Sequence, residues 1–227
     1  MFYLAMTIGG AFLYMVARPA IHTPGDAAQT AANLIEHETT ARFAIAAALL
    51  ASIGQSGTVL YLYKLFGRRD QFSATALVAF GVINTAAGMM VATFWTTGLS
   101  IATGTGYGGS NETVLLLFDL SQSIVDVGYL FWGLWLLPMG WLVTKSEQMP
   151  RLLGRMLMVG AAGYTFSAFI GQMFDGRWVD VVVEAVQVPA HIGEVWMVGY
   201  LLVFGAGIAN ATVNDKFDNR GSSNGAS

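Results

Sequence analysis

Residues 72–99 read FSATALVAFGVINTAAGMMVATFWTTGL, a run without a single Asp, Glu, Lys, Arg or His. The hydrocarbon core of a bilayer is about 30 Å thick, and an α-helix needs about 20 apolar residues to cross it. This run is therefore long enough to span a membrane, with residues left over for tilt or for protrusion beyond the bilayer. It predicts a transmembrane helix.

Five further apolar stretches flank this run. The six predicted spans are Phe2–Ala17, Arg42–Phe66, Phe72–Leu99, Thr113–Val143, Leu152–Phe174 and Val181–Ile208. The composition agrees, because 55% of the residues are hydrophobic and 11% are charged, whereas soluble domains carry about 25% charged residues. We predict an all-α polytopic membrane bundle of six transmembrane helices, a single domain over residues 1–213, with a polar, flexible cytoplasmic tail over residues 214–227.

The basic residues predict the orientation of the bundle. Eight of the eleven fall on one side: Lys64, Arg68, Arg69, Lys145, Arg151, Arg155, Lys216 and Arg220. The other three, Arg18, Arg42 and Arg177, fall on the opposite side. Cytoplasmic connections are enriched in Lys and Arg. We therefore expect a multi-pass protein of the cytoplasmic membrane, in contact with lipid, with both termini in the cytoplasm.

A short external amphipathic helix is predicted between the first two spans. Pro24-Gly25-Asp26 forms a start signal in which Asp26 is a suitable N-cap. The predicted apolar face consists of Ala27, Ala28, Ala31, Ala32 and Ile35, and the polar face of Gln29, Thr30, Asn33 and His37. Such a helix would lie at the membrane interface or cap the bundle, and a lid over a cavity is the alternative.

Polar side chains follow one face of the fourth span. Asp119, Gln122, Ser123 and Asp126 stand at offsets of three, four and seven residues from the first, which places them within one helical stripe. At a rise of about 1.5 Å per residue, Asp119 lies ~9 Å and Asp126 ~20 Å from the external face. Ionisable groups at such depth are costly and are candidates for function.

The sixth span carries a second stripe, in which Gln187, His191 and Glu194 share a face. The same helical rise places His191 ~15 Å and Glu194 ~20 Å deep. We expect the two stripes to face each other, so that Asp119 or Asp126 meets His191. Polar residues of the other spans that would complete a pocket are Gln55, Ser56, Asn84, Thr85 and Tyr164.

The inventory of residues excludes several classes of site. The chain has no cysteine, which rules out disulfides, thiolate metal sites and thiol catalysis. A net charge of −3 argues against nucleic acid, and no HExxH, GxSxG or P-loop pattern occurs. A haem held by two histidines needs two of them at depth, and His191 is the one deep histidine. A retinal Schiff base needs a buried lysine, and no lysine or arginine is expected at depth. We therefore predict neither a metal nor any other cofactor.

Small and aromatic residues mark faces that pack against neighbours. Gly163, Ser167 and Gly171 recur at a spacing of four on the fifth span, which permits close helix contact within the bundle or with another subunit. Trp132, Trp135 and Trp141 are interpreted as an interface and lipid belt. A surface that binds a pigment or a quinone would use the same tryptophans.

Three classes of function fit these observations. The leading hypothesis is a proton-, cation- or small-ligand-linked bundle with an acidic intramembrane cavity. The second is a non-catalytic accessory or scaffold subunit of a larger membrane complex, associated through the small-residue and aromatic faces. The third is a membrane enzyme that uses buried carboxylates and His191, and it is disfavoured because no catalytic motif is present. A buried polar network that merely fixes helix register is the alternative to all three.

Three segments resemble a bacterial integral membrane family catalogued as domain of unknown function 4386. The first is residues 24–33 (PGDAAQTAAN). The second runs from DVGY at 126–129 through FWGLW at 131–135 and Gly140 to PRLLG at 150–154. The third is the pair Gly193-Glu194. The family often carries a histidine shortly before the second segment, where this chain has Asp119-Leu120-Ser121-Gln122 instead. The resemblance implies a six-helix protein of the bacterial inner membrane, and it implies no activity.

Overall fold

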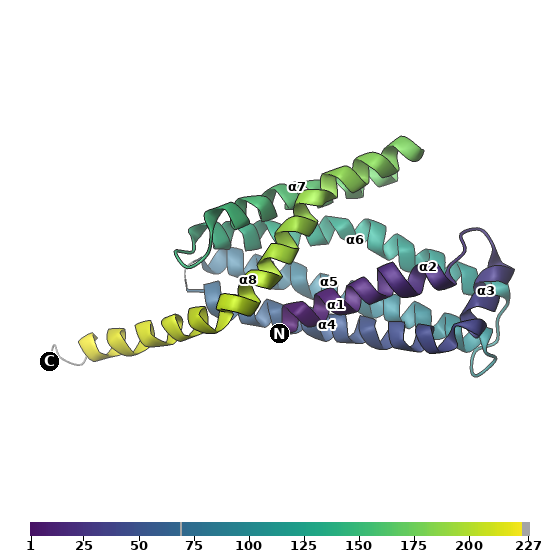
Figure 1. Ribbon diagram of the computed structural model, residues 1–227, viewed down its shortest axis with the longest axis horizontal. Coiled ribbons are helices and arrows are strands. Elements are labelled where there is room, and N and C mark those ends of the chain that lie inside the picture. Colours follow the sequence, from purple (N-terminus) through teal and green to yellow (C-terminus); the bar gives the residue numbers. More distant parts are fainter. Residues whose placement is uncertain (69, 224–227) are drawn as a thin grey trace.

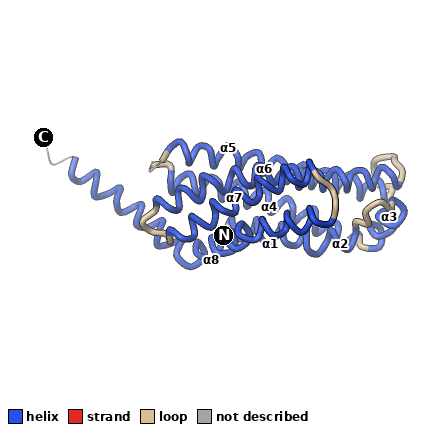
Figure 2. Tube along the Cα trace, turned by 90° about the horizontal axis from the view of Figure 1, so that it is seen from above, coloured by secondary structure: helices blue, strands red, loops and turns tan. Residues whose placement is uncertain are grey.

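The computed structural model describes the backbone of residues 1–68 and 70–223, and the side chains of these residues as far as Phe204. Within that part of the chain every regular element is a helix (Figures 1 and 2). Among the described residues, six helical segments are long and apolar enough to cross a membrane. They are Phe2–Ile21, α4 (Glu38–Phe66), α5 (Gln71–Ala102), α6 (Asn111–Lys145), α7 (Arg151–Met173) and the Arg177–Phe204 part of α8 (Arg177–Ser223). The prediction of a six-span all-α bundle is confirmed.

The outer surface of these helices is apolar, as expected of a protein in contact with lipid. Leu60 is 66% exposed, Val82 58% and Phe169 56%, and each lies within a different span. In water such a surface would lose the hydrophobic free energy of burial, whereas in a bilayer it meets acyl chains. The chain is therefore a multi-pass membrane protein.

The first span is interrupted by a π-helix. It consists of α1 (Phe2–Ala11), the π-helical segment η1 (Phe12–Ala17) and α2 (Arg18–Ile21). Pro19 has no backbone N–H to donate to the preceding turn, and the N–H of Arg18 bonds the carbonyl of Leu13, in the π register. Such π segments re-aim side chains and are frequent at functional sites.

Glycines allow the first five spans to approach closely. A Cβ on Gly54 of α4 would lie 2.6 Å from the backbone of Phe2 and Met6, and one on Gly154 of α7 would lie 2.6 Å from the carbonyl of Gly140. The backbones can approach this closely because glycine has no Cβ. Such close approach at small residues is typical of helix packing in membranes. These seams lock α1 to α4 and α6 to α7.

The sixth span is held mainly by one neighbour. Helix α8 packs mainly on α7 and lies at an angle across the bundle (Figure 1). At the crossing, Gly160 and Gly163 of α7 face the backbone of Ala190 and Val186. Ser167, which we predicted to belong to the same small-residue face, is buried and accepts a hydrogen bond from Gln187 at 3.0 Å. Gly163 and Ser167 thus pack inside the chain, and Gly171 has open space around it.

The predicted short helix is α3 (Ala27–Glu36), and Asp26 caps it by accepting a hydrogen bond from the N–H of Gln29 at 2.9 Å. Its buried face differs from the expected one. Thr30, Ala31 and Leu34 are buried, while Ile35 is 54% exposed. The reason is that Thr30 bonds both the N–H and the carbonyl of Thr23, so a polar side chain satisfies the turn beneath the helix.

The connection between α4 and α5 is tied to the end of α6. Asp70 caps α5 through the N–H of Ser73 at 3.1 Å, accepts a hydrogen bond from Trp141 Nε1 at 3.1 Å and lies 3.7 Å from Lys145 Nζ. These interactions, led by the Ser73 N–H, hold the pKa of Asp70 below its ordinary value. Arg69, one of the basic residues that predict the orientation, lies outside the described residues.

The tryptophans correct one expectation. Trp141 is 43% exposed, in agreement with an interfacial position, whereas Trp135 is 1% exposed and packs edge-on against Tyr3. Trp132 contacts Tyr129 and Tyr164 inside the bundle. The interface-belt interpretation is therefore wrong for Trp135. The backbone of α8 continues to Ser223, and residues 224–227 of the predicted tail lie outside the described part of the chain.

Candidate functional site

A cavity of about 600 Å³ lies between the first span and α4, α5, α6, α7 and α8. We call it the main cavity. Its walls near the first span are largely apolar, with Met6, Ala11 and Leu13 among them. Polar and aromatic side chains from every one of these spans also line it: Arg18, Gln55, Asn84, Gln122, Tyr129, Trp132, Trp135, Tyr164, His191 and Glu194. This mixture is typical of a small-molecule site, in which a few polar groups orient a ligand within an apolar enclosure.

The polar centre of the main cavity is a hydrogen bond between neighbouring helices. The hydroxyl of Tyr164 on α7 donates to Oε2 of Glu194 on α8 at 2.8 Å. The ring of Tyr164 also meets His191 edge-on, with 5.7 Å between centroids, and packs against Tyr129 at 5.5 Å. A carboxyl group held by a tyrosine within an aromatic wall can bind a polar ligand group or exchange a proton with it.

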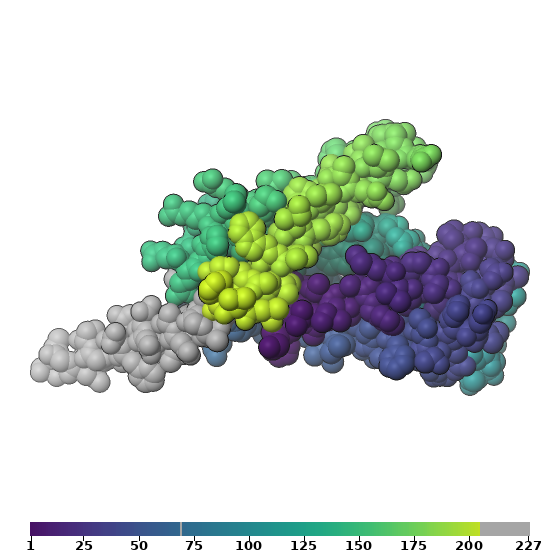
Figure 3. All heavy atoms as spheres, viewed as in Figure 1, coloured from purple at the N-terminus to yellow at the C-terminus, as the bar shows by residue number. Residues whose placement is uncertain are grey.

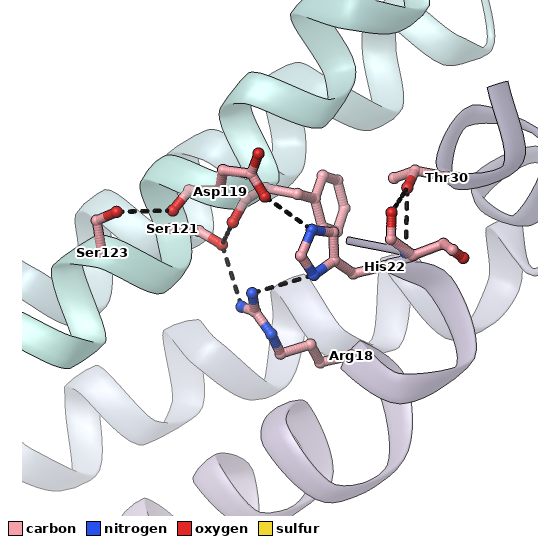
Figure 4. Close-up of polar contacts among 8 residues, drawn as sticks. Arg18, His22, Thr30, Asp119, Ser121 and Ser123 are labelled. Atoms are coloured by element: carbon pink, nitrogen blue, oxygen red, sulfur yellow. Dashed lines mark hydrogen bonds and ion pairs between the residues drawn. The ribbon is translucent and has the colours of Figure 1, made fainter. Parts of the chain in front are cut away.

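At the other end of the cavity, Arg18 begins a chain of polar contacts (Figure 4). Its Nη1 donates to Ser121 Oγ at 3.4 Å, and its Nη2 lies 3.2 Å from Nδ1 of His22. Nε2 of His22 lies 2.9 Å from Oδ1 of Asp119. Because a guanidinium can only donate, Nδ1 of His22 must accept, and Nε2 carries the proton that goes to Asp119.

The electrostatics of this chain favour a neutral His22. Its side chain is 7% exposed and stacks on Phe118 with 5.9 Å between centroids. Burial lowers the pKa of His22 below its ordinary value and the charge of Arg18 lowers it further, while the contact with Asp119 acts in the opposite direction. These polar contacts connect α2 and the residue after it to α6, beside the main cavity.

A second, more polar cavity of about 340 Å³ lies between α6, the end of α7 and the start of α8. We call it the vestibule. Three carboxylates line it, Asp126, Asp175 and Asp180, and Gln122 and Tyr129 line both cavities. Gln122 donates to Asp126 at 2.6 Å, so this pair stands where the two cavities meet.

The structure brings together many of the residues that the sequence singled out. Six of them line the main cavity: Gln55, Asn84, Gln122, Tyr164, His191 and Glu194. Asp126 lines the vestibule. Gln187 is buried, and its amide donates to Ser167 beside the vestibule.

Four predicted residues lie elsewhere. Asp119, one of the two carboxylates expected to meet His191, pairs with His22 instead, because the connection after the first span folds back over α6. Ser123 is exposed and bonds the carbonyl of Asp119. Ser56 and Thr85 bond carbonyls of their own helices, with 3.4 Å between their hydroxyls, away from both cavities.

Sequence reasoning missed Arg18, His22, Tyr129 and Trp135. Arg18 was counted as an external residue, yet its guanidinium lines the main cavity, so the lining is not purely acidic. A signal for Arg18 was its position directly before Pro19 at the end of an apolar run. Among the described residues, no three His, Asp or Glu side chains are grouped so that they could hold a metal ion.

Comparison with known proteins gives a family match over most of the chain. The model of the family described as "Domain of unknown function (DUF4386)" matches residues 1–205. A segment of 83 residues is 32% identical to a protein of Archaeoglobus fulgidus described as uncharacterized, and it covers 37% of this chain and 47% of that relative. The match thus spans about half of the relative's length. No solved structure matches the chain.

Proposed function

The chain belongs to the family described as a domain of unknown function (DUF4386), and from this premise we propose that it is a membrane protein that binds a small ligand in the main cavity. The observation that carries the proposal is the Glu194–Tyr164 hydrogen bond inside a cavity of about 600 Å³. Ionisable groups at membrane depth are costly, so they usually face a cavity and belong to a functional site. A cavity of this size holds a drug-sized molecule.

Three properties of the lining support a ligand rather than a purely structural network. Glycine seams already bring the helices into close contact, so the polar groups are not the only contacts between them. His191 is exposed and lines the main cavity despite its position within a span. Arg18 offers hydrogen-bond donors and Glu194 a carboxyl group within one cavity, so a ligand with both a donor and an acceptor group finds partners there.

Linkage to protons or cations is the finer part of the proposal. Asp126, Asp175 and Asp180 line the vestibule, which meets the main cavity at Gln122 and Tyr129. With both termini in the cytoplasm, the vestibule faces the outside of the cytoplasmic membrane. Protons and small cations would then enter from the outside along this acidic surface, because like-signed carboxylates attract positive charge.

The proposal is tested by looking for a retained ligand. We expect native mass spectrometry of the protein released from lipid nanodiscs to show a stoichiometric adduct. Gly10→Trp should abolish it, because Gly10 lines the main cavity and an added side chain meets nothing within 4 Å there. Gly199→Trp, in equally open space on α8 outside the cavity, is the matched control. A wild-type protein without an adduct, or an adduct that persists in Gly10→Trp, would overturn the proposal.

A further inference from the structure

The main cavity is open sideways. Its lining comes from both the first span and α8, which border the hollow visible on the surface in Figure 3. Helix α8 packs mainly on α7, and its side toward the first span is left open. The helices run roughly along the length of the bundle (Figure 2), so this opening faces the acyl chains and not the water at either end. A molecule can enter the cavity from the bilayer.

The wall of the opening is apolar and as long as one alkyl chain. Met15 of η1 is 78% exposed and Val195 of α8 is 66% exposed, and both line the cavity. Further along the first span, Ala11 and Met6 continue the lining. From Arg18 to Met6 this wall extends over ~18 Å at a helical rise of ~1.5 Å per residue. That length is close to the hydrocarbon of one leaflet, which is about half of a bilayer core of ~30 Å.

Arg18 stands at the end of this wall, at the depth of the lipid head groups. It lies three residues before Ile21, where the first span ends. Its guanidinium does not extend freely into the water, because Ser121 and His22 hold it against α6 (Figure 4). A guanidinium has more N–H donors than these two contacts use. The donors that remain belong to a side chain that lines the main cavity.

The positive charge of Arg18 has no paired anion. A guanidinium stays protonated in proteins. Among the described residues Arg18 forms no ion pair with a carboxylate, and Asp119, the acidic member of its contact chain, pairs with His22 instead. Glu194 lies at the other end of the cavity, where Tyr164 holds it. A charge that is held away from water is costly unless an anion pairs with it.

We propose that the ligand is an anionic amphiphile with one alkyl chain, of the fatty-acid kind, whose head binds Arg18 and whose chain lies along the first span. This inference rests on the proposed function, that the main cavity binds a ligand, and it adds the acceptor group, the apolar body and the route. Arginine pairs strongly with carboxylates and phosphates through parallel hydrogen bonds. A cavity of about 600 Å³ has the size that holds one drug-sized molecule, which suits one chain better than a two-chain lipid.

The test compares three tritiated probes that share the chain of palmitic acid and differ in their heads: the acid, the alcohol and the amine. Binding to the protein in phosphatidylcholine nanodiscs is measured against empty nanodiscs, at a pH of about 9, where a free carboxyl group is ionised. We expect saturable binding of the acid and at least about tenfold weaker binding of the alcohol and the amine, the order of one charge-assisted hydrogen bond. Equal binding of the acid and the alcohol, or a preference for the amine, would overturn the inference.

Two competitors test the body of the ligand. Acetate in large excess should not displace palmitate, because it has no chain to bury against the apolar wall. Nanodiscs that contain phosphatidylglycerol should leave palmitate binding unchanged, when it is compared with empty nanodiscs of the same composition. Displacement by acetate would assign Arg18 to a water-soluble anion, and displacement by phosphatidylglycerol would assign the cavity to a two-chain lipid. Either result would overturn the inference.

A variant connects the head-group preference to Arg18. Arg18→Gln should weaken binding of the acid at least about tenfold and leave binding of the alcohol unchanged. Arg42→Gln is the matched control, because Arg42 pairs with Glu38 outside the cavity lining, and it should change neither. Thermal unfolding shows whether each variant is folded. If Arg18→Gln is unfolded, Arg18→Lys decides, since an ammonium cannot form the parallel pair of hydrogen bonds. An unchanged preference for the acid in the folded variant would overturn the assignment of Arg18.

The outcomes separate this inference from the proposed function. If the native adduct is present and sensitive to Gly10→Trp but palmitate does not displace it, the cavity binds a ligand of another class and the inference fails alone. If no adduct exists and no probe binds, both fail. If palmitate displaces the adduct and Gly10→Trp abolishes palmitate binding, both are supported, because Gly10 lines the cavity on the side of the first span.

Discussion

At the scale of single residues, the contact chain of Arg18, His22 and Asp119 shows how little a residue's chemistry reveals before its neighbours are known. Each of the three is an ordinary polar residue in the sequence. In the fold, the guanidinium fixes which nitrogen of the imidazole carries the proton, and the carboxylate receives that proton in a hydrogen bond of 2.9 Å. A proton added to Nδ1 would break the contact with Arg18 and place two cations side by side.

This arrangement predicts a pH dependence of stability. Because the pKa of His22 is lowered in the fold, the unfolded chain takes up a proton first, and the unfolding free energy falls as the pH drops below the ordinary histidine pKa of about 6.5. His22→Gln keeps a donor toward Asp119 but does not titrate. Its melting temperature should therefore fall less than that of the wild type between pH ~7.5 and ~5.5, a range that brackets this pKa.

Differential scanning fluorimetry of the purified protein measures both curves. His37→Gln, a substitution of the histidine at the junction of α3 and α4, controls for the loss of an imidazole elsewhere in the chain. The interpretation of His22 would be contradicted if the melting temperatures of its variant and of the wild type decreased by the same amount over this range. It would also be contradicted if the melting temperature of the His37 variant alone depended less on pH.

At the scale of elements, glycines carry the close contacts between helices, and α8 differs from the first five spans in packing mainly on one neighbour. The first five spans meet through glycine seams such as the one between Gly140 and Gly154. Helix α8 is attached mainly to α7, at the crossing of Gly160 and Gly163 with Ala190 and Val186. Since α8 supplies His191 and Glu194, this crossing decides whether the main cavity has its polar wall.

Gly163→Ala tests the crossing. An added Cβ would overlap the carbonyl of Val186, which is backbone and cannot rotate away. We expect a loss of about 1–3 kcal/mol of stability, the usual cost of overpacking, seen as a lower melting temperature in detergent. Gly171→Ala on the same helix meets nothing within 4 Å and should be close to neutral. Equal effects of the two substitutions would mean that α8 does not pack on α7 at this point.

At the scale of the whole molecule, two openings differ in direction. The vestibule lies at the bundle end where α7 gives way to α8, and the main cavity opens between α8 and the first span (Figure 3). They share Gln122 and Tyr129. The vestibule can thus be reached from one membrane surface along polar residues, and the neighbouring main cavity can be reached from the bilayer along apolar residues. Which surface the vestibule faces depends on the orientation of the chain.

The orientation is testable because the sequence contains no cysteine, so single cysteines can be introduced without a background. Tyr107 lies exposed in the connection between α5 and α6, and Glu147 lies exposed between α6 and α7. We expect a membrane-impermeant maleimide to label Tyr107→Cys in intact cells and Glu147→Cys only after permeabilisation, in line with the distribution of basic residues. The reverse labelling pattern would mean that the protein has the opposite orientation in the membrane, with the vestibule on the cytoplasmic side.

The sequence by itself determined the spans, the Asp26 cap of α3 and the polar faces of α6 and α8. Hydropathy, capping and helical periodicity depend on residues within a few positions of one another, so they can be read along the chain. Most of the predicted cavity residues also lie on the main cavity or the vestibule. Their grouping follows because polar faces at membrane depth turn inward.

The tertiary structure alone decided which partners these residues find. Asp119 meets His22, Trp135 is buried in place of lying at the interface, and α3 turns Thr30 inward. Each outcome depends on the rotation of one helix against another and on a connection that folds back over α6. These are set by the fit of side chains across the whole bundle, where backbone groups must be satisfied and glycines permit close approach. No local pattern in the chain carries that information.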